Sequence, residues 1–367
     1  MKTNPKNERI KHEYIAYLEE AKRMSPASAE DAAAAISQFE DTTRHKDFAA
    51  FHIEQARRFK RVLDDAKNTQ TGRPLSKATI HSRLLAVKAF FFWLASQPGY
   101  KSRISYSDCE YFNPTANDAR IATARGEPRV PTLDQIRHVI GDMPSEMLIE
   151  QRDRAILAFT ILTGARDNAI ASFNVGHVDL SRRTVFHDAS TVRTKNRKTF
   201  TSTFFPVGED IEEIVREWIH TLRADCLFSD TDPLFPATNI ALNTRGEFEP
   251  NGFQRRHWST ADPIRKLFRR AFTAASLPYF NPHSFRNTLA RLGQSICRTP
   301  EEMKAWSQNL GHEEMMTTLT SYGKLDGYRQ SEILNLLASG PQGVISTEGE
   351  PTPDIVNWVL DYLRRGK

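Results

Sequence analysis

The segment LGHEEMMTTLTSYGKL, residues 310–325, places a Gly-His pair ahead of a helical run that leads to a tyrosine. Tyr322 follows His312 by ten residues and is itself followed by Gly323. A single tyrosine in such a run is usually a packed aromatic side chain. Whether Tyr322 is a reacting group therefore depends on which other residues accompany it along the chain.

Three polar motifs precede this segment. Arg166 lies in LTGARDNAI, and residues 192–200, VRTKNRKTF, predict a basic turn between two strands. His283 and Arg286 lie in NPHSFRNTLA. They are three residues apart, so they share one face of a helix that begins after Pro282. Each motif alone is weak evidence for a site, but all stand in one order along the chain.

TG-x-R, a basic turn, H-x-x-R, LGH and a tyrosine together resemble the signature of the tyrosine recombinases, the phage integrase family. The resemblance covers about residues 130–335, and residues 1–100 resemble the family's core-binding domain more loosely. It implies that Tyr322 attacks a DNA phosphodiester and forms a 3′-phosphotyrosine link. Because that link keeps the energy of the broken bond, rejoining needs no ATP, metal or other cofactor.

The reaction accounts for the residue types. Attack by a phenol places extra negative charge on the non-bridging phosphate oxygens, and Arg166 and Arg286 are suited to clamp them with planar, permanently charged donors. His283 and His312 add hydrogen-bond donors or a proton acceptor for the phenol. These are the catalytic residues that the resemblance implies, together with Tyr322.

The leaving 5′-oxygen needs a proton, which the family takes from a lysine on a β-hairpin. The basic turn offers Lys195 as the first candidate and Lys198 as the second. The sequence departs from the family pattern in three places. The position three residues after the first arginine is commonly acidic and is Ala169 here, the spacing from His312 to Tyr322 is one residue longer than in many members, and the basic turn is longer.

The charge distribution favours double-stranded DNA as a partner. The net charge is only +5, but residues 66–107 and 189–208 contain no acid, and residues 254–272 contain only Asp262. Three separate windows of this kind are typical of a protein that binds a polyanion. The residues expected to contact DNA are Lys77, His81, Arg83, Lys88, Arg193 and Lys198. The resemblance implies a homo-tetramer on two copies of a specific recombination site.

The expected fold is mainly α with a small β-sheet. It places a helical core-binding, SAM-like DNA-binding domain at residues 1–100 and a linker at 101–129. An α+β catalytic domain follows at 130–337, and residues 338–367 form a flexible tail with a C-terminal helix.

Local signals refine this outline. Ser28 and Thr132 are predicted to cap helices, and Phe48 to Ala66 is predicted to form the third helix. Strands are expected on both sides of the basic turn, and helices dominate from there to about Leu337.

The tail sequence DIVNWVLDYLRR, residues 354–365, predicts an amphipathic helix after a flexible spacer. Ile355, Val359 and Tyr362 form an apolar stripe that must be buried. In related recombinases a C-terminal segment docks on the neighbouring protomer, so we expect docking in trans, with packing in cis as the alternative.

Composition argues against membrane and secreted classes. The longest apolar run, Ala89 to Ala95, is far shorter than the roughly 20 residues that span a bilayer. The N-terminal residues lack the apolar segment of a secretory signal. Cys109, Cys226 and Cys297 are scattered and show no metal-ligand spacing. We therefore expect a cytoplasmic, nucleoid-associated protein without a bound metal.

Two alternative functions are compatible with the resemblance. The first is a non-catalytic DNA-binding protein that kept the recombinase fold, in which loss of individual reacting groups would be tolerated. The second is a type IB topoisomerase, which shares the chemistry. The presence of every reacting group favours a catalyst for recombination and DNA integration on mobile elements, and the leading helical domain and the tail favour a recombinase over a topoisomerase.

Overall fold

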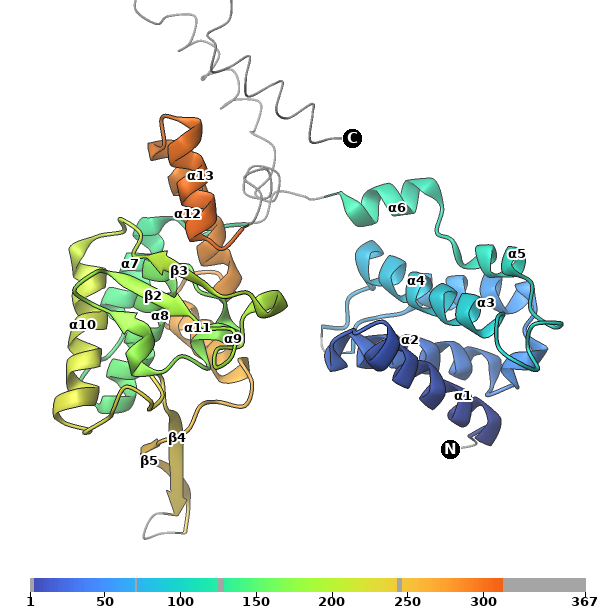
Figure 1. The fold of residues 1–367 in the computed structure, drawn as a ribbon, viewed down its shortest axis with the longest axis horizontal. Helices are drawn as coiled ribbons and strands as arrows, with labels where there is room; N and C mark the ends of the chain where they lie inside the picture. Colours follow the sequence, from blue (N-terminus) through green and yellow to red (C-terminus); the bar gives the residue numbers. More distant parts are fainter. Residues whose placement is uncertain (1–2, 70, 125–128, 243–245, 313–367) are drawn as a thin grey trace, which may run out of the picture. The chain divides into compact units, whose positions relative to one another are not determined.

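The structure is a computed structural model that describes residues 3–69, 71–124, 129–242 and 246–312. The chain divides into two compact units, Met1–Arg125 and Gly126–Lys367 (Figure 1). Each unit has its own hydrophobic core. Tyr322 and the predicted C-terminal helix lie outside the described residues, as does the expected boundary between the catalytic domain and the tail.

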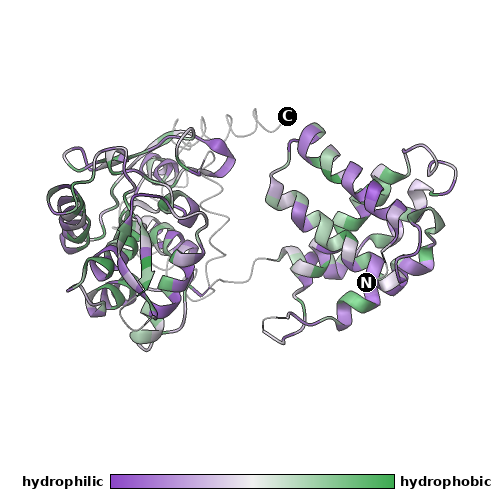
Figure 2. Cartoon of the chain, turned by 90° about the horizontal axis from the view of Figure 1, so that it is seen from below, coloured by the Kyte–Doolittle hydropathy of each residue, from purple (hydrophilic) through white to green (hydrophobic). Residues whose placement is uncertain are grey.

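The first unit is helical. Its α-helices are α1 (Pro5–Ala16), α2 (Pro26–Thr43), α3 (Ile53–Asp65), α4 (Lys77–Leu94), α5 (Tyr106–Cys109) and α6 (Ala116–Thr123). Hydrophobic and hydrophilic residues alternate along these helices in Figure 2, as expected for helices that bury one face. The centre of the core is aromatic: the ring of Phe39 lies edge-on to those of Phe59, Phe91 and Phe112.

Helix starts in this unit differ from two of the expectations. Ser25, not Ser28, caps α2, because its hydroxyl accepts the Ser28 N–H at 3.2 Å and Pro26 occupies the first helical position. The third helix begins at Ile53 rather than at Phe48. His52 caps it by accepting the Glu54 N–H at 3.3 Å.

The polar stretch expected to form a linker, 101–129, is largely folded onto the first unit. It contains α5, α6 and a 3₁₀ turn at Glu110–Phe112. Ile104, Cys109 and Phe112 are buried in the core of this unit. Few apolar side chains of the segment are buried, and ion pairs such as Lys88–Glu110 also hold it in place, which explains why its composition resembles a linker.

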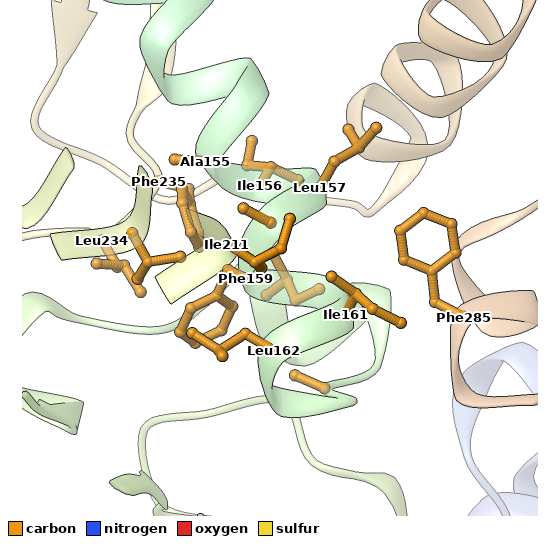
Figure 3. Packing of buried hydrophobic residues seen from close by; sticks show 14 of the residues in the cluster. Ala155, Ile156, Leu157, Phe159, Ile161, Leu162, Ile211, Leu234, Phe235 and Phe285 are labelled. Atoms are coloured by element: carbon orange, nitrogen blue, oxygen red, sulfur yellow. The ribbon is translucent and has the colours of Figure 1, made fainter. Parts of the chain in front are cut away.

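The second unit is built around α8 (Leu148–Thr163). Every residue of α8 from Ala155 onward is buried, so the helix is surrounded by other elements on all sides. The flanking helices are α7 (Leu133–Asp142), α9 (Asp167–Ile170), α10 (Glu209–Ala224), α11 (Asp262–Ala274), α12 (Pro282–Ile296) and α13 (Pro300–Asn309). Figure 3 shows side chains packed around α8, including Ile211 of α10, Phe285 of α12, and Leu234 and Phe235 of the segment before β4.

Two expectations for this unit are confirmed. Thr132 caps α7, accepting the Gln135 N–H at 3.1 Å while the Gln135 side chain accepts the Thr132 N–H at 3.0 Å. The two strands around the basic turn are β2 (Thr184–His187) and β3 (Phe200–Thr203), which pair antiparallel with Thr184 opposite Thr203. The short β1 (Val178–Asp179) completes a three-stranded sheet in the order β1-β2-β3, so β3 lies at an edge.

A second hairpin interrupts the helices that, as expected, dominate after the basic turn. Strands β4 (Ala237–Leu242) and β5 (Phe248–Gln254) pair antiparallel and extend away from the body of the unit (Figure 1). Their sequence shows little of the alternation that marks a half-buried strand, because the hairpin packs only at its base. Ile240, Leu242 and Phe248 are exposed near its far end. None of the helices in the described part of the chain combines the length and the apolar character needed to span a bilayer.

Arg152 anchors the base of this hairpin on α8. Its side chain is only 4% exposed. Nε and Nη2 donate to one carboxylate oxygen of Asp153 at 3.0 and 2.7 Å, and Nη1 donates to the Pro236 carbonyl and the Thr238 hydroxyl, both at 2.9 Å. Two aromatic rings from β5 and the segment after it lie 5.2 and 5.0 Å from the guanidinium: Phe253 and Trp258. A buried charge is thus fully engaged by one carboxylate, two oxygen acceptors and two rings.

We predict that Arg152→Met lowers the free energy of unfolding by about 3 kcal/mol, because it leaves the Pro236 carbonyl and the Thr238 hydroxyl without the Arg152 donor and Asp153 with only the exposed Arg270 as a partner. The matched control is Arg270→Met. Arg270 binds the second oxygen of Asp153 at 2.7 Å but its side chain is 73% exposed, so its loss should lower the free energy of unfolding by less than about 1 kcal/mol. Urea unfolding measures both values. Equal decreases in the free energy of unfolding would show that the buried contacts of Arg152 stabilise the protein no more than a surface ion pair does.

Candidate active site

The first arginine of the site is placed by a tight turn after α8. Gly164 ends the helix with φ +63°, and a Cβ at this position would lie 3.0 to 3.2 Å from the side chains of Leu310, Leu289 and Phe205. Only glycine fits both the left-handed backbone and the close packing. Arg166 follows at the N-cap of α9 with its side chain half-buried. The predicted TG-x-R motif is therefore a turn that directs Arg166 out of the core.

The second arginine is held from within the core. Arg286 is 2% exposed on α12, directly after the fully buried Phe285. Its Nη1 donates to the Gly164 carbonyl, and its Nη2 donates to the Leu310 carbonyl at 2.6 Å. The guanidinium thereby joins the turn after α8 to the end of α13.

Arg286 also fixes the protonation state of His312. The distance between Arg286 Nη2 and His312 Nε2 is 3.1 Å. A guanidinium nitrogen has only protons to offer, so Nε2 must accept and the neutral ring carries its proton on Nδ1. Partial burial lowers the pKa of His312 to about 4, and the positive charges of Arg286, Arg166 and Lys195 act in the same direction.

His283 shares this electrostatic environment. Partial burial lowers the pKa of His283, followed by the positive charges of Arg286 and Arg166 and, more weakly, Lys195, although much of the residue remains exposed to solvent. The structure thus brings four of the predicted catalytic residues, and Lys195 with them, close enough to interact electrostatically. Tyr322, the predicted nucleophile, lies outside the described residues.

The basic turn between β2 and β3 approaches the site from one side. Asn196 and Arg197 adopt left-handed backbone conformations, with φ of 59° and 51°. Lys195 is exposed and lines a hollow of about 620 Å³ together with Arg166. Lys198 lines a second hollow of about 500 Å³ together with His312. Lys195 lies near Arg166 and Lys198 lies near His312, so both remain candidates for the proton donor.

Arg193, expected from the sequence to contact DNA, makes hydrogen bonds within its own unit. Its guanidinium donates to three backbone carbonyls, those of Ala171 at 2.9 Å, Trp258 at 2.6 Å and Ser259. Its backbone N–H donates to the Ser172 hydroxyl at 2.9 Å. Arg193 therefore fastens the basic turn to the end of α9 and to the segment after β5. Charge alone does not distinguish this role from DNA binding in the sequence.

The DNA-contact residues predicted on α4 have different surroundings in the first unit. Lys77 pairs with Asp64 at 3.1 Å and Asp118 at 2.9 Å. Lys88 pairs with Glu110 at 2.9 Å. Arg83 and Lys88 line a groove of about 1680 Å³ beside α2 and α4, and His81 is half-buried on the same helix. The two lysines thus have acidic partners within their own unit, which the acid-free local sequence does not reveal.

The position commonly acidic in the family is filled by the core residue Ala169, 3% exposed. The nearby Asp167 pairs with Arg265 of α11 at 2.7 Å. Sequence reasoning also missed His187 at the end of β2, which is 3% exposed. Burial lowers its pKa to about 3, with Arg286 and Arg166 adding to the effect. Its position in the alternating strand TVFH is the only sequence signal that it faces inward.

Within the described ranges, no cluster of three or more His, Cys, Asp or Glu side chains has the arrangement of a metal site. The site consists instead of two guanidiniums, two neutral imidazoles and a neighbouring basic turn. Such a set of preorganised donors suits an anionic ligand with several oxygens.

Comparison with known proteins agrees with the motifs. Residues 132–329 match the model of the phage integrase family. Among curated relatives, the tyrosine recombinase XerC of Thermodesulfovibrio yellowstonii is 24% identical over 247 residues, covering 66% of this chain and 70% of the relative. XerC of Halalkalibacterium halodurans is 21% identical over 313 residues, covering 83% and 89%.

Solved structures share the fold. A lambda integrase dimer bound to a COC′ core site superposes with a TM-score of 0.58 at 12% identity, covering 87% of this chain and 96% of that one. The Tn1549 transposon integrase in complex with transposon right end DNA superposes with a TM-score of 0.57 at 16% identity, covering 90% and 99%. The family model spans more than half of the 367 residues. The chain therefore belongs to the phage integrase family, the tyrosine recombinases.

Proposed function

We propose that this protein is a site-specific DNA recombinase that cuts and rejoins DNA strands through a 3′-phosphotyrosine at Tyr322, without metal or ATP. The observation that carries the proposal is the convergence of Arg166, Arg286, His283 and His312 beside the basic turn. Membership of the tyrosine recombinase family supports the same reaction class.

The geometry suits stabilisation of a phosphorane-like transition state. Arg286 is buried and held by two backbone carbonyls, so little reorganisation accompanies the growth of charge on the phosphate oxygens. Arg166 approaches from the turn after α8 and provides the second clamp. Because the core fixes the Arg286 guanidinium, this half of the proposed clamp is in place before DNA binds.

Proton transfers complete the reaction. The Tyr322 phenol forms a bond to phosphorus as its proton passes to a neutral histidine, and the bond from phosphorus to the 5′-oxygen breaks. His283 is suited to accept that proton because its lowered pKa keeps the ring neutral at physiological pH. His312 accepts from Arg286 on Nε2, so its Nδ1–H can serve as a hydrogen-bond donor. The 5′-oxygen takes a proton from Lys195 or Lys198. Reversal of these steps on a new 5′-hydroxyl rejoins the strand.

The partner we propose is double-stranded DNA carrying a specific recombination site. The lambda and Tn1549 integrases, which share the fold, were solved with DNA. In the first unit, the groove beside α2 and α4 that Arg83 lines is the surface we assign to the DNA backbone. We further propose action in the cytoplasm on the nucleoid, as a tetramer on two sites, with residues 354–365 docking between protomers.

Tyr322→Phe should abolish the covalent protein–DNA adduct and leave DNA affinity nearly unchanged, because it removes one hydroxyl. The substrate is a nicked duplex carrying the site that the protein selects from a random-sequence pool, and the adduct is counted after denaturing electrophoresis. Tyr328→Phe is the matched control and should form the adduct normally. An adduct in Tyr322→Phe that disappears in Tyr328→Phe would move the nucleophile. Specific binding without any wild-type adduct would make the protein a non-catalytic binder.

Arg166→Ala should slow cleavage by roughly 10²-fold, the usual effect of removing one preorganised donor from a developing oxyanion. Single-turnover cleavage at saturating protein measures the rate. Arg216→Ala serves as the control, since Arg216 pairs with Glu212 on α10 outside the cluster. Cleavage by Arg166→Ala at the control rate would remove Arg166 from the phosphate clamp.

The proton donor is identified by a change of leaving group. A 5′-bridging phosphorothiolate departs as a thiolate and needs no proton. If Lys195 is the general acid, Lys195→Ala slows cleavage of ordinary DNA and is restored on the phosphorothiolate, whereas Lys198→Ala shows no such restoration. The reverse pattern would assign the role to Lys198.

A further inference from the structure

The segment that presents His312 is joined to strand β3 by one side chain. The Asn309 amide donates from Nδ2 to the Thr203 carbonyl at 2.8 Å and accepts the Thr203 N–H on Oδ1 at 2.6 Å. Thr203 is opposite Thr184 in the sheet, and its N–H and C=O point away from β2 at the sheet edge. Asn309 therefore pairs with the edge of β3 as a residue of a fourth strand would.

The same strand contacts the segment at a second point. Gly311 has φ +72°, and a Cβ there would lie 2.8 Å from the ring of Phe200. Phe200 is the first residue of β3 and stacks on the buried His187, with centroids 4.1 Å apart and 13° between the planes. His187 in turn shares a 2.9 Å hydrogen bond with Ser202. The backbone just before His312 thus rests on a ring whose position the sheet fixes.

The hydrogen bonds of Asn309 are not the local cap of its own helix. They join residues 106 positions apart in the chain. The C-cap of α13 is Leu310, whose carbonyl is bound by Arg286 at 2.6 Å. Residues 309–312 are accordingly held from two sides, by α12 through Arg286 and by β3 through Asn309 and Phe200.

Strand β3 is also the strand in which the basic turn ends, since Phe200 follows the turn that contains Lys195 and Lys198. We propose that Asn309 is a positioning residue that fixes His312 relative to β3, and thereby relative to the lysines of the basic turn. The inference rests on the proposed function, which assigns both to one reaction. Asn309 does not touch the reacting atoms; it acts through Thr203.

The test compares Asn309→Ala and Asn309→Asp with Glu301→Gln, a substitution of an exposed residue on the same helix. In Asn309→Ala the cleavage rate at saturating nicked DNA should fall by roughly 10- to 100-fold, since small misplacements of a reacting group have effects of this size, while the DNA dissociation constant stays within about twofold. Asn309→Asp keeps the acceptor for the Thr203 N–H and loses the donor, so it should be intermediate. Glu301→Gln should match the wild type.

Two measurements report on the linkage without cleavage. Hydrogen exchange at the Thr203 amide should accelerate in Asn309→Ala, and the pKa of His312 followed by NMR should rise from about 4 towards its ordinary value as the ring becomes less buried. In the described part of the chain, the charged and titratable groups near His312 are Arg286, Arg166, His283, Lys195 and Lys198. All of them are retained in the variant, so a rise in the pKa reports a change in the position of His312.

A change of leaving group tests whether Asn309 positions His312 relative to the proton-donor lysine. A 5′-phosphorothiolate should restore cleavage fully in the variant of the proton-donor lysine but only partly in Asn309→Ala, because the latter also displaces His312. Full-rate cleavage by Asn309→Ala, with accelerated exchange at Thr203, would overturn the proposal and leave the proposed function intact. Absence of a wild-type adduct would instead overturn the proposed function, while exchange and the His312 titration would still decide whether Asn309 positions the histidine.

Discussion

The hydrogen bonds of the buried Arg286 guanidinium are the interaction on which the arrangement of the second unit depends. The guanidinium binds the carbonyls of Gly164 and Leu310 and the ring of His312, so one charge joins the turn after α8, helix α12 and the end of α13. Such a charge is tolerated in a core only when its donors are matched by acceptors. The contacts that satisfy Arg286 are also the ones that bring His312 and the turn before Arg166 beside it.

The positive charge of the cluster determines the state of its histidines. His187, His283 and His312 all have lowered pKa values, in each case through burial first and through Arg286 and Arg166 next. Arginines remain charged at any pH the protein meets, so the imidazoles lose their protons instead. The site therefore combines permanently charged guanidiniums with imidazoles that are neutral at physiological pH.

Sequence patterns revealed the elements whose signals are local. Thr132, the turn around Gly164 and the strands beside the basic turn follow from caps, glycine and β-branched content, and the order of Arg166, His283, Arg286 and His312 identified the family. What escaped prediction depends on distant partners. Arg193 looks like any basic residue until its three carbonyl acceptors are known, and the β4–β5 hairpin lacks alternation because little of it is buried. Asn309 pairs with a strand 106 residues away.

The anchoring of the β4–β5 hairpin limits how the unit can be altered by deletion. The hairpin resembles a peripheral insertion that could be removed, yet its strands and the following segment supply Arg152 with the Thr238 hydroxyl and the rings of Phe253 and Trp258. Removal would leave Arg152, on the helix around which the core is built, with Asp153 but without the Thr238 hydroxyl and the two rings. A shortened protein would therefore need a compensating apolar residue at position 152, so the length of this hairpin and the identity of a residue far from it in sequence must change together.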